Sequence, residues 1–242
     1  MKGIVLAGGL GTRLAPMTRV TNKHLLPVYD RPMVYYPIQT LVEAGITEIL
    51  LVTGGNHAGD FLRLLGNGKD FGLRHLNYTY QEGEGGIAAA LSLAEDFADG
   101  APVCVILGDN ILQKSIRPAV ERYGRTNRGG MVLLKEVPDP ERFGVPVFEG
   151  DRIARIVEKP QAPPSHFAVV GVYLYDARVF DVIRTLKPSG RDELEITDVN
   201  NQFLAWGELD HVELDGWWTD AGSVESLYRA TCLVARDRAE GR

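Results

Sequence analysis

A glycine-rich segment that carries its own cation lies close to the N-terminus. Residues 8–14 read Gly-Gly-Leu-Gly-Thr-Arg-Leu and directly follow the apolar run Gly3–Ala7, which we expect to form a buried strand. Glycines at such a turn let backbone N–H groups approach an anion closely. Arg13 supplies a planar guanidinium for phosphate oxygens, and Lys23 adds a compact charge. The segment therefore predicts a phosphate-binding loop, with a strand-to-helix turn and a surface arginine as the alternative.

Two common nucleotide-binding signatures do not fit this segment. A P-loop needs lysine and then serine or threonine after its last glycine, and no lysine follows Gly11. A dinucleotide-binding fingerprint that starts at Gly9 needs a third glycine where Leu14 stands. A nicotinamide-dependent oxidoreductase is therefore disfavoured.

A candidate acidic residue follows a second apolar run. Asp109 comes one glycine after Val103–Leu107, a run that is typical of a strand buried on both faces of a parallel sheet. Ligands bind at the carboxyl ends of such strands, so Asp109 is a candidate binding residue. A turn-forming pair with Asn110 is the alternative. No Ser–His or Cys–His arrangement stands out, and the histidines show no metal-ligand spacing; they are His24, His57, His75, His166 and His211.

An alternating α/β framework is expected to hold these residues. Apolar runs predict strands at Gly3–Ala7, Glu48–Val52, Asn77–Tyr80, Val103–Leu107 and Met131–Leu134. Amphipathic stretches predict helices at Met33–Ala44, His57–Leu65, Gly86–Phe97 and Ser115–Asn127. This alternation indicates βαβ units and a mostly parallel sheet. After about residue 135, shorter links join further strands at Val145–Phe148, Ile153–Val157, Val169–Tyr175 and His211–Leu214, with helices from Ala177 and about Ser223. We expect one domain over residues 1–242.

Composition limits the classes of partner. The 242 residues include 26 Lys and Arg against 32 Asp and Glu, which gives a formal net charge of −6. Such a chain has no global field for nucleic acid or for an anionic membrane, so we expect neither as a partner. Bound phosphates must instead be held by a few local cations and backbone amides.

Export signals are not evident. The first apolar stretch is shorter than the ~7–15 residues of a signal peptide core, and no apolar run approaches the ~20 residues that span a bilayer. Cys104 and Cys232 are expected to be free thiols, because a chain of this size needs no disulfide. A cytoplasmic location is therefore expected.

A series of short blocks resembles the glucose-1-phosphate thymidylyltransferases of the sugar-1-phosphate nucleotidyltransferase family. Each block alone is weak, but they stand in family order over nearly the whole chain. The blocks are Gly8–Leu14, Asn22–Met33, Tyr35–Pro37, Leu107–Asn110, Phe143–Val145, Glu158–Pro160, Glu193–Asn200 and Trp218–Gly222.

The resemblance implies a fold and an arrangement of substrates. The expected fold is α/β and Rossmann-like, a mixed but mainly parallel sheet flanked by helices. A single nucleotidyltransferase domain would bind the nucleotide in about residues 1–135 and the sugar phosphate in about residues 136–242. The chain looks like the short form of the family, without a C-terminal helical extension. A homo-oligomer is expected, with a tetramer favoured.

The resemblance also implies a reaction. A nucleotidyl group would pass from dTTP to glucose 1-phosphate by a Mg²⁺-assisted in-line displacement, giving dTDP-glucose and pyrophosphate. Arg13, Lys23 and Lys159 would be the catalytic cations. Asp109 and Asp220 would hold Mg²⁺, a hard cation that one or two carboxylates and substrate phosphates typically bind. Only the resemblance brings these two carboxylates together, because they are far apart in the sequence.

The remaining site residues are assigned by the same resemblance. Gln81 offers a donor and an acceptor to the edge of a pyrimidine, and Gly86 offers its backbone. The nucleotide-binding set is Leu6, Gly8, Gly9, Gly11, Thr12, Arg13, Gln81, Gly86 and Asp109. The sugar-phosphate-binding set is Gly144, Glu158, Lys159, Val169 and Tyr173. Aromatic residues at Tyr35, Tyr36, Trp217 and Trp218 are more typical of a core or a subunit contact than of ligand stacking.

Three departures from the family pattern concern specificity. His24 stands where many members have glutamine, Phe143 stands where many have tyrosine, and residues 82–85 of the base-recognition loop differ. The alternatives are therefore a uridylyl- or cytidylyltransferase for another sugar phosphate, or a catalytically silent module that binds a nucleotide sugar for regulation. The presence of Arg13, Lys23, Asp109 and Asp220 favours an enzyme over the silent module.

Overall fold

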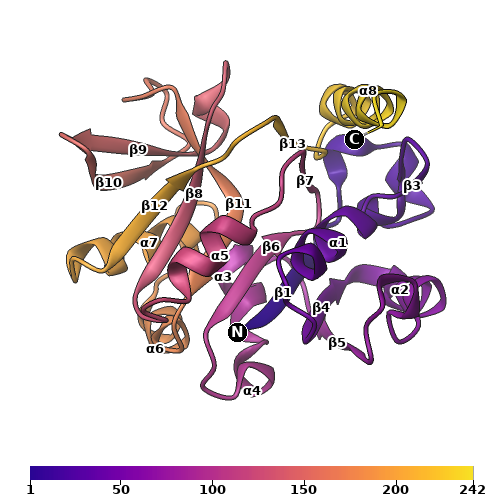
Figure 1. Ribbon diagram of the computed structural model, residues 1–242, viewed down its shortest axis with the longest axis horizontal. Coiled ribbons are helices and arrows are strands. Elements are labelled where there is room, and N and C mark those ends of the chain that lie inside the picture. Colours follow the sequence, from indigo (N-terminus) through magenta and orange to yellow (C-terminus); the bar gives the residue numbers. More distant parts are fainter. Residues whose placement is uncertain (242) are drawn as a thin grey trace.

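The computed structural model describes residues 1–241 and is built on a nine-stranded mixed sheet (Figure 1). One path through the sheet has the order β10-β9-β11-β6-β1-β4-β5, with β8 paired to both β11 and β12. The strands are β1 (Lys2–Ala7), β4 (Ile49–Gly54), β5 (Leu76–Gln81), β6 (Val103–Leu107), β8 (Gly130–Glu136), β9 (Gly144–Glu149), β10 (Arg152–Glu158), β11 (Phe167–Tyr175) and β12 (Leu209–Glu213).

The N-terminal half supplies a parallel block. Strand β1 pairs in parallel with β4 and β6, and β4 pairs in parallel with β5. Every residue of β4 is buried, as the continuous apolar run predicts for a strand covered on both faces. The carboxyl ends of these strands open into the glycine-rich segment and into Asp109, so both features meet at one edge of the sheet.

The C-terminal half adds antiparallel strands to the same sheet. The nine-residue strand β11 pairs antiparallel with β6, β8 and β9, and β9 forms an antiparallel hairpin with β10. Strand β12 runs parallel to β8. The expected mixed sheet is therefore confirmed, with its parallel part concentrated in the first half of the chain.

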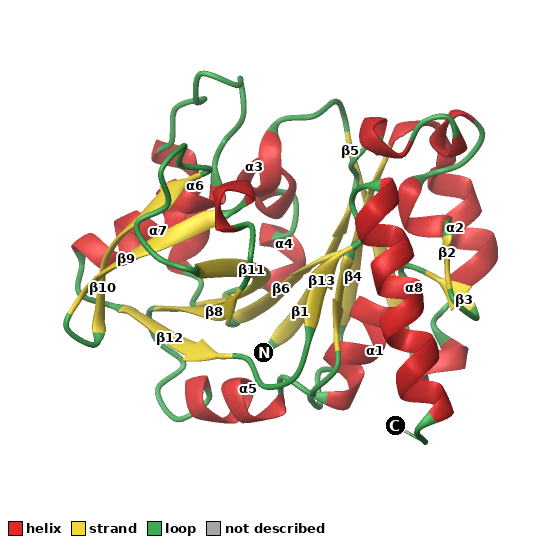
Figure 2. Cartoon of the chain, turned by 90° about the horizontal axis from the view of Figure 1, so that it is seen from above, coloured by secondary structure: helices red, strands yellow, loops and turns green. Residues whose placement is uncertain are grey.

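Helices cover both faces of the sheet. Alternate residues of β1 belong to two apolar clusters, one on each face of the sheet. Ile4 and Leu6 belong to the first cluster, and Val5 and Ala7 belong to the second. The first cluster includes residues of α3 (Gly86–Ser92), α4 (Glu95–Ala98), α6 (Arg178–Thr185) and α7 (Ile196–Ala205). The second includes residues of α1 (Tyr35–Glu43), α2 (Ala58–Leu65) and α5 (Arg117–Tyr123). Figure 2 shows α3 and α5 on opposite sides of the sheet.

The helix expected over Gly86–Phe97 is interrupted. It is divided into α3 and α4, with Leu93 and Ala94 between them. The Ser92 hydroxyl donates to the Ala89 carbonyl at 2.8 Å, and such local side-chain bonding competes with a continuous helix. None of the helices described in residues 1–241 is long and apolar enough to cross a bilayer. Cys104 and Cys232 are free, as expected.

A short ribbon outside the main sheet positions the site. Strand β7 (Asn110–Leu112) pairs antiparallel with β13 (Trp218–Asp220), and Asp220 lies opposite Asn110. Helix α8 (Val224–Ala239) follows β13 and packs beside the hairpin of β2 (Pro27–Val28) and β3 (Arg31–Pro32). Ser223 caps α8 by accepting from the N–H of Ser226, which fixes the chain direction directly after β13. Residues from the two ends of the chain are thereby brought beside the end of β6.

Candidate active site

A cavity of about 510 Å³ opens at the carboxyl ends of the parallel strands. It is lined by residues of both halves of the chain, and every site residue predicted from the sequence is among them. These are Leu6, Gly8, Gly9, Gly11, Thr12, Arg13, Lys23, Gln81, Gly86, Asp109, Gly144, Glu158, Lys159, Val169, Tyr173 and Asp220. A volume of this size falls in the range of small-molecule sites.

Asp109 and Asp220 converge because of the β7–β13 ribbon. The backbone N–H of Ala221 donates to the Asp109 carbonyl at 2.8 Å, which ties the two segments together. A methyl group added to Gly222 would lie 3.4 Å from Oδ2 of Asp109, 3.4 Å from Oδ2 of Asp220 and 3.1 Å from Nη2 of Arg13. Two carboxylates and a guanidinium thus surround one small space, which the absence of a side chain at Gly222 leaves open.

Each carboxylate is paired with a cation. Lys23 Nζ donates to Asp109 Oδ2 at 2.6 Å, and Arg142 Nη2 donates to Asp220 Oδ2 at 2.9 Å. Burial favours a raised pKa for Asp109, but the charges of Lys23 and His24 and a hydrogen bond from Lys23 hold the pKa well below its usual range. The pKa of Asp220 is raised, because burial and the Asp109 charge outweigh the effects of Arg142 and Arg13.

The donor set fits a hard divalent cation. Within residues 1–241 there is no cluster of three acidic, histidine or cysteine side chains that would enclose a metal by itself. Two carboxylates facing one space are nevertheless the protein contribution that Mg²⁺ typically takes, with substrate phosphates and water supplying the other oxygens. Asp109 and Asp220 would therefore hold such an ion together with a phosphate-bearing substrate.

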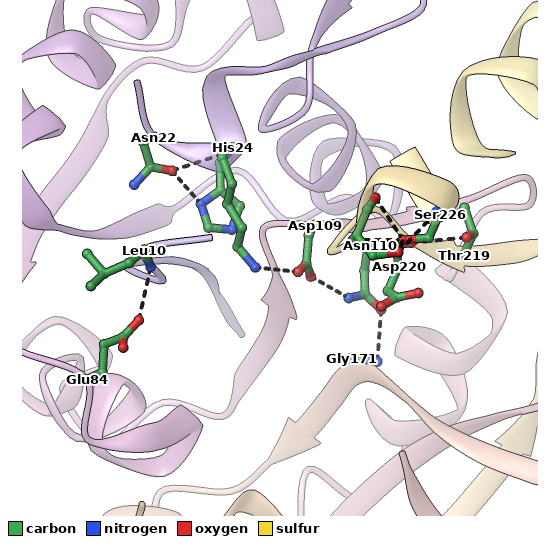
Figure 3. A network of polar contacts seen from close by, with 12 residues as sticks. Leu10, Asn22, His24, Glu84, Asp109, Asn110, Gly171, Thr219, Asp220 and Ser226 are labelled. Carbon is green, nitrogen blue, oxygen red and sulfur yellow. Dashed lines mark hydrogen bonds and ion pairs between the residues drawn. The ribbon is translucent and has the colours of Figure 1, made fainter. Parts of the chain in front are cut away.

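Asn110 bonds to Oδ1 of Asp109 (Figure 3), the carboxylate oxygen that Lys23 does not contact. Its Nδ2 donates to Asp109 Oδ1 at 3.0 Å, while its Oδ1 accepts from the N–H of Gly171 at 3.0 Å and from Nε1 of Trp218 at 2.7 Å. Asn110 is only 1% exposed, so these bonds are sheltered from water. The Asp-Asn pair is thus a positioning device for the carboxylate rather than a solvent turn.

His24, the residue that follows Lys23 in the chain, is buried. Lys23 and His24 belong to a single 3₁₀ turn, Lys23–Leu25, which is capped by Asn22. Asn22 Oδ1 accepts from the backbone N–H of His24 at 2.9 Å and lies 2.8 Å from its Nδ1 (Figure 3). A methyl group added to Gly108 would lie 2.7 Å from Cδ2 of His24, so the ring packs against the end of β6. Burial, reinforced by the Lys23 charge, lowers the pKa of His24 to about 3.

The depressed pKa of His24 predicts a pH-dependent stability. The unfolded chain binds a proton at this histidine below about pH 6.5, whereas the folded chain does so only near pH 3. The free energy of unfolding should therefore fall as the pH drops through this window, by about 1 kcal/mol between about pH 7 and about pH 5.5. His24→Gln removes the titrating group, so denaturant unfolding at both pH values should show a smaller loss in the variant. Equal losses in the two proteins would contradict this assignment.

The end of the cavity beside β5 is built from two glycine-containing loops. Gln81 is 9% exposed, and its Oε1 lies 2.5 Å from where a Cβ on Gly8 would be. Gly86 has a φ of 90°, and a Cβ there would lie 2.6 Å from the Leu194 carbonyl oxygen. The positive φ and the backbone contact require glycine at position 86, whereas glycine at position 8 leaves room for the Gln81 amide.

The end of the cavity beside β10, at the other end of the sheet path from β5, is rich in carboxylates. Glu158 accepts from Thr197 Oγ1 at 2.6 Å and from Arg191 Nη2 at 3.1 Å, and Arg191 also pairs with Glu195 at 2.9 Å. Carboxylate oxygens accept from hydroxyl groups, so this end suits a polyhydroxyl ligand. Lys159 lies at its mouth, 48% exposed at the side chain.

The backbone of Lys159 is held in an unusual conformation. Its φ is 42°, in the left-handed region that non-glycine residues rarely adopt. Its N–H donates to the Phe143 carbonyl at 2.9 Å, and Pro160 disfavours the right-handed helical region for the residue before it. Backbone strain of this kind, of order 1–3 kcal/mol, clusters at functional sites.

Comparisons with known proteins agree with this geometry. The sequence pattern of the nucleotidyl transferase family matches residues 2–237 of the chain. The chain belongs to this family. Among its relatives, the glucose-1-phosphate thymidylyltransferase of Actinoplanes sp. is 46% identical over 100% of this chain and 80% of its own length. The enzyme of that name from Neisseria meningitidis is 45% identical over 97% of this chain and 82% of its own length.

Solved structures of the nucleotidyl transferase fold extend the match. A provisionally assigned glucose-1-phosphate thymidylyltransferase from Bacillus anthracis, in complex with sucrose, superposes with a TM-score of 0.92 at 52% identity and covers 96% of this chain and 94% of its own. A UDP-glucose pyrophosphorylase in complex with UDP-glucose superposes with a TM-score of 0.86 at 25% identity and covers 98% of each chain.

Several cavity residues were not predicted from the sequence of this nucleotidyl transferase. Four of them line the cavity: Asn110, Arg142, Arg191 and Thr197. Each lies in or beside one of the family-like blocks, and that position was the sequence signal that could have identified them. Of the four aromatic residues considered as ligand contacts, Trp218 alone lines the cavity described here. Tyr36 donates to the Val28 carbonyl, and Trp217 donates to Asp237, so both have structural partners.

Proposed function

We propose that this nucleotidyl transferase makes dTDP-glucose and pyrophosphate from dTTP and glucose 1-phosphate. The observation that carries the proposal is the space at Gly222, where Asp109, Asp220 and Arg13 face one another. Asp109 follows β6, which lies between β5 and β10 in the sheet path; β5 ends at the pyrimidine-compatible Gln81, and β10 ends at Glu158 in the carboxylate-rich part of the cavity. The curated relatives that are 45–46% identical bear the name of this activity.

The chemistry is a displacement at phosphorus. A phosphate oxygen of glucose 1-phosphate attacks the α-phosphorus of dTTP, and the bond between that phosphorus and the bridging oxygen to the β-phosphate breaks, so pyrophosphate leaves with the bonding electron pair. Two anions must meet, so the site has to neutralise charge and fix geometry rather than supply a nucleophile. Arg13 and Lys23 stabilise the triphosphate charge as pyrophosphate departs. Lys159 holds the sugar phosphate, and Glu158 accepts from sugar hydroxyls.

The proposed cofactor is Mg²⁺, held by Asp109 and Asp220. When bound, it supplies Lewis-acid stabilisation of the phosphate oxygens. The chain prepares this site by orienting both carboxylates and by keeping Asp109 ionised. Lys23 and Asn110 bond to Asp109, and Arg142 bonds to Asp220. A cation beside each carboxylate therefore offsets the repulsion between the two negative charges.

Base selection rests on Gln81, whose amide offers a donor and an acceptor to a pyrimidine edge. Thymine differs from uracil by one methyl group, and discrimination of that size is worth only ~1–3 kcal/mol. We therefore expect UTP to be used more slowly than dTTP rather than rejected. The structural similarity to a UDP-glucose pyrophosphorylase favours UTP as the second substrate.

A substrate panel tests the proposal. Purified protein is incubated with each of dTTP, UTP, CTP, ATP and GTP, with glucose 1-phosphate and Mg²⁺, and pyrophosphate release is measured. We expect the largest kcat/KM with dTTP, a lower value with UTP, and no release when the sugar phosphate or the metal is omitted. Preference for CTP or a purine triphosphate, or no pyrophosphate release with any of the five triphosphates, would contradict it.

A further inference from the structure

An acidic side chain of the base-recognition loop contacts the glycine-rich loop. Glu84 Oε1 accepts from the backbone N–H of Leu10 at 3.1 Å (Figure 3). Glu84 belongs to the connection between β5 and α3, whereas Leu10 lies between Gly9 and Gly11. All four residues line the same cavity. Within residues 8–13 of the described chain, the N–H of Leu10 is the one that bonds to an acidic side chain.

The Leu10 N–H is a donor of the kind that phosphates use. It sits in a glycine-rich turn after a parallel strand, and such turns bind anions through backbone N–H groups. Arg13 follows in the same turn. A carboxylate that accepts from this N–H therefore occupies a position suited to a phosphate oxygen, and it places a negative charge where a triphosphate must come.

We propose that Glu84 is a competitor for the nucleotide, occupying a backbone donor of the phosphate-binding loop until the triphosphate displaces it. The inference rests on the proposed function, because it takes the nucleoside triphosphate as the ligand of that loop. Glu84 thus lowers the affinity for the nucleotide, because binding breaks one charge-assisted hydrogen bond and brings the triphosphate close to one carboxylate.

The surroundings allow Glu84 to leave without disturbing base recognition. Glu84 is exposed, and the preceding Gly83 has a φ of 70° with no atom within 4 Å of an added Cβ. Gln81, in contrast, is buried against Gly8. The carboxylate can therefore swing out about the glycine while the amide that reads the base remains fixed.

Glu82 provides a matched control for the experiment. It lies two residues before Glu84 in the same loop, is also exposed, and does not line the cavity. Replacing either glutamate by glutamine or alanine removes the same charge from the same loop. Only the changes at Glu84 remove the charge that accepts from Leu10.

The test is calorimetric titration of dTTP with Mg²⁺, without sugar phosphate, into the parent, E84Q, E84A, E82Q and E82A. We expect E84A to bind dTTP roughly 2- to 12-fold more tightly than the parent, as for removal of one competing hydrogen bond, with E84Q between them. E82Q and E82A should bind as the parent does. Titration of glucose 1-phosphate should give the same affinity in all five proteins.

The outcomes separate the inference from the proposed function. Weaker or unchanged dTTP binding by E84A, or an equal gain in E82A, would overturn the competitor role while leaving the function intact. A parent protein that does not bind dTTP would instead refute the proposed function. Since Glu84 is exposed, thermal unfolding of all five proteins should coincide, which excludes a folding effect as the cause.

Discussion

Asp109→Asn should reduce kcat for nucleotidyl transfer by at least about 10²–10³-fold while the protein remains folded. The substitution keeps the shape of the side chain but removes the charge that faces Asp220 across the space at Gly222. It also leaves Lys23 Nζ without the carboxylate that lies 2.6 Å away, so the lysine is no longer held by an opposite charge. The measurement is pyrophosphate release at saturating substrates, with circular dichroism to verify the fold.

Asp139→Asn is the matched control for this substitution. Asp139 accepts from Arg142 Nη1 at 2.7 Å but does not line the cavity. The same change of charge therefore falls on a carboxylate outside the cavity that shares Arg142 with Asp220. Its kcat should stay within a few-fold of the parent. An Asp109→Asn protein as active as the Asp139→Asn protein would show that the Asp109 charge is not needed.

Arg13→Ala should lower kcat/KM for dTTP by about 10²–10³-fold with no change in stability. In the described part of the chain Arg13 forms no ion pair with a carboxylate, in contrast to Lys23 and Arg142, so its guanidinium is available to the substrate. The side chain is exposed in the turn, which is why we expect the free energy of unfolding to be unaffected. Arg13→Lys should recover only part of the activity, because an ammonium does not reproduce the planar fork that grips phosphate oxygens.

Arg19 is the control for Arg13. It is also an exposed arginine at the end of a 3₁₀ turn, Met17–Arg19, but it does not line the cavity. Arg19→Ala should leave the steady-state kinetics of nucleotidyl transfer unchanged. A loss in Arg19→Ala equal to that in Arg13→Ala would mean that long-range charge, rather than contact with the triphosphate, explains the effect.

Most of the framework was predictable because its signals are local. Continuous apolar runs marked the buried parallel strands, and β6 has the bounds that the sequence predicted. The glycine-rich turn and Asp109 follow such strands directly, so their place at one sheet edge followed from the parallel arrangement. The break between α3 and α4 was missed because one serine bonding to a nearby carbonyl leaves no periodic pattern.

The convergence of the two carboxylates was not readable from local pattern. It depends on the ribbon of β7 and β13, two strands of three residues each that are too short for any alternation to be recognised. Only the family resemblance predicted that Asp109 and Asp220 lie together. The partners Arg142 and Glu84 were missed for the same reason, since each contacts a residue distant in the sequence through a single side chain.

The most direct measurement is the fate of the oxygens of the sugar phosphate. The three non-bridging oxygens of glucose 1-phosphate are labelled with ¹⁸O, the protein is incubated with dTTP and Mg²⁺, and the products are analysed by mass spectrometry. Attack on the α-phosphorus predicts that the complete label appears in dTDP-glucose and that the pyrophosphate is unlabelled and equal in amount. Label in the pyrophosphate, or release of inorganic phosphate in place of a nucleotide sugar, would contradict the account.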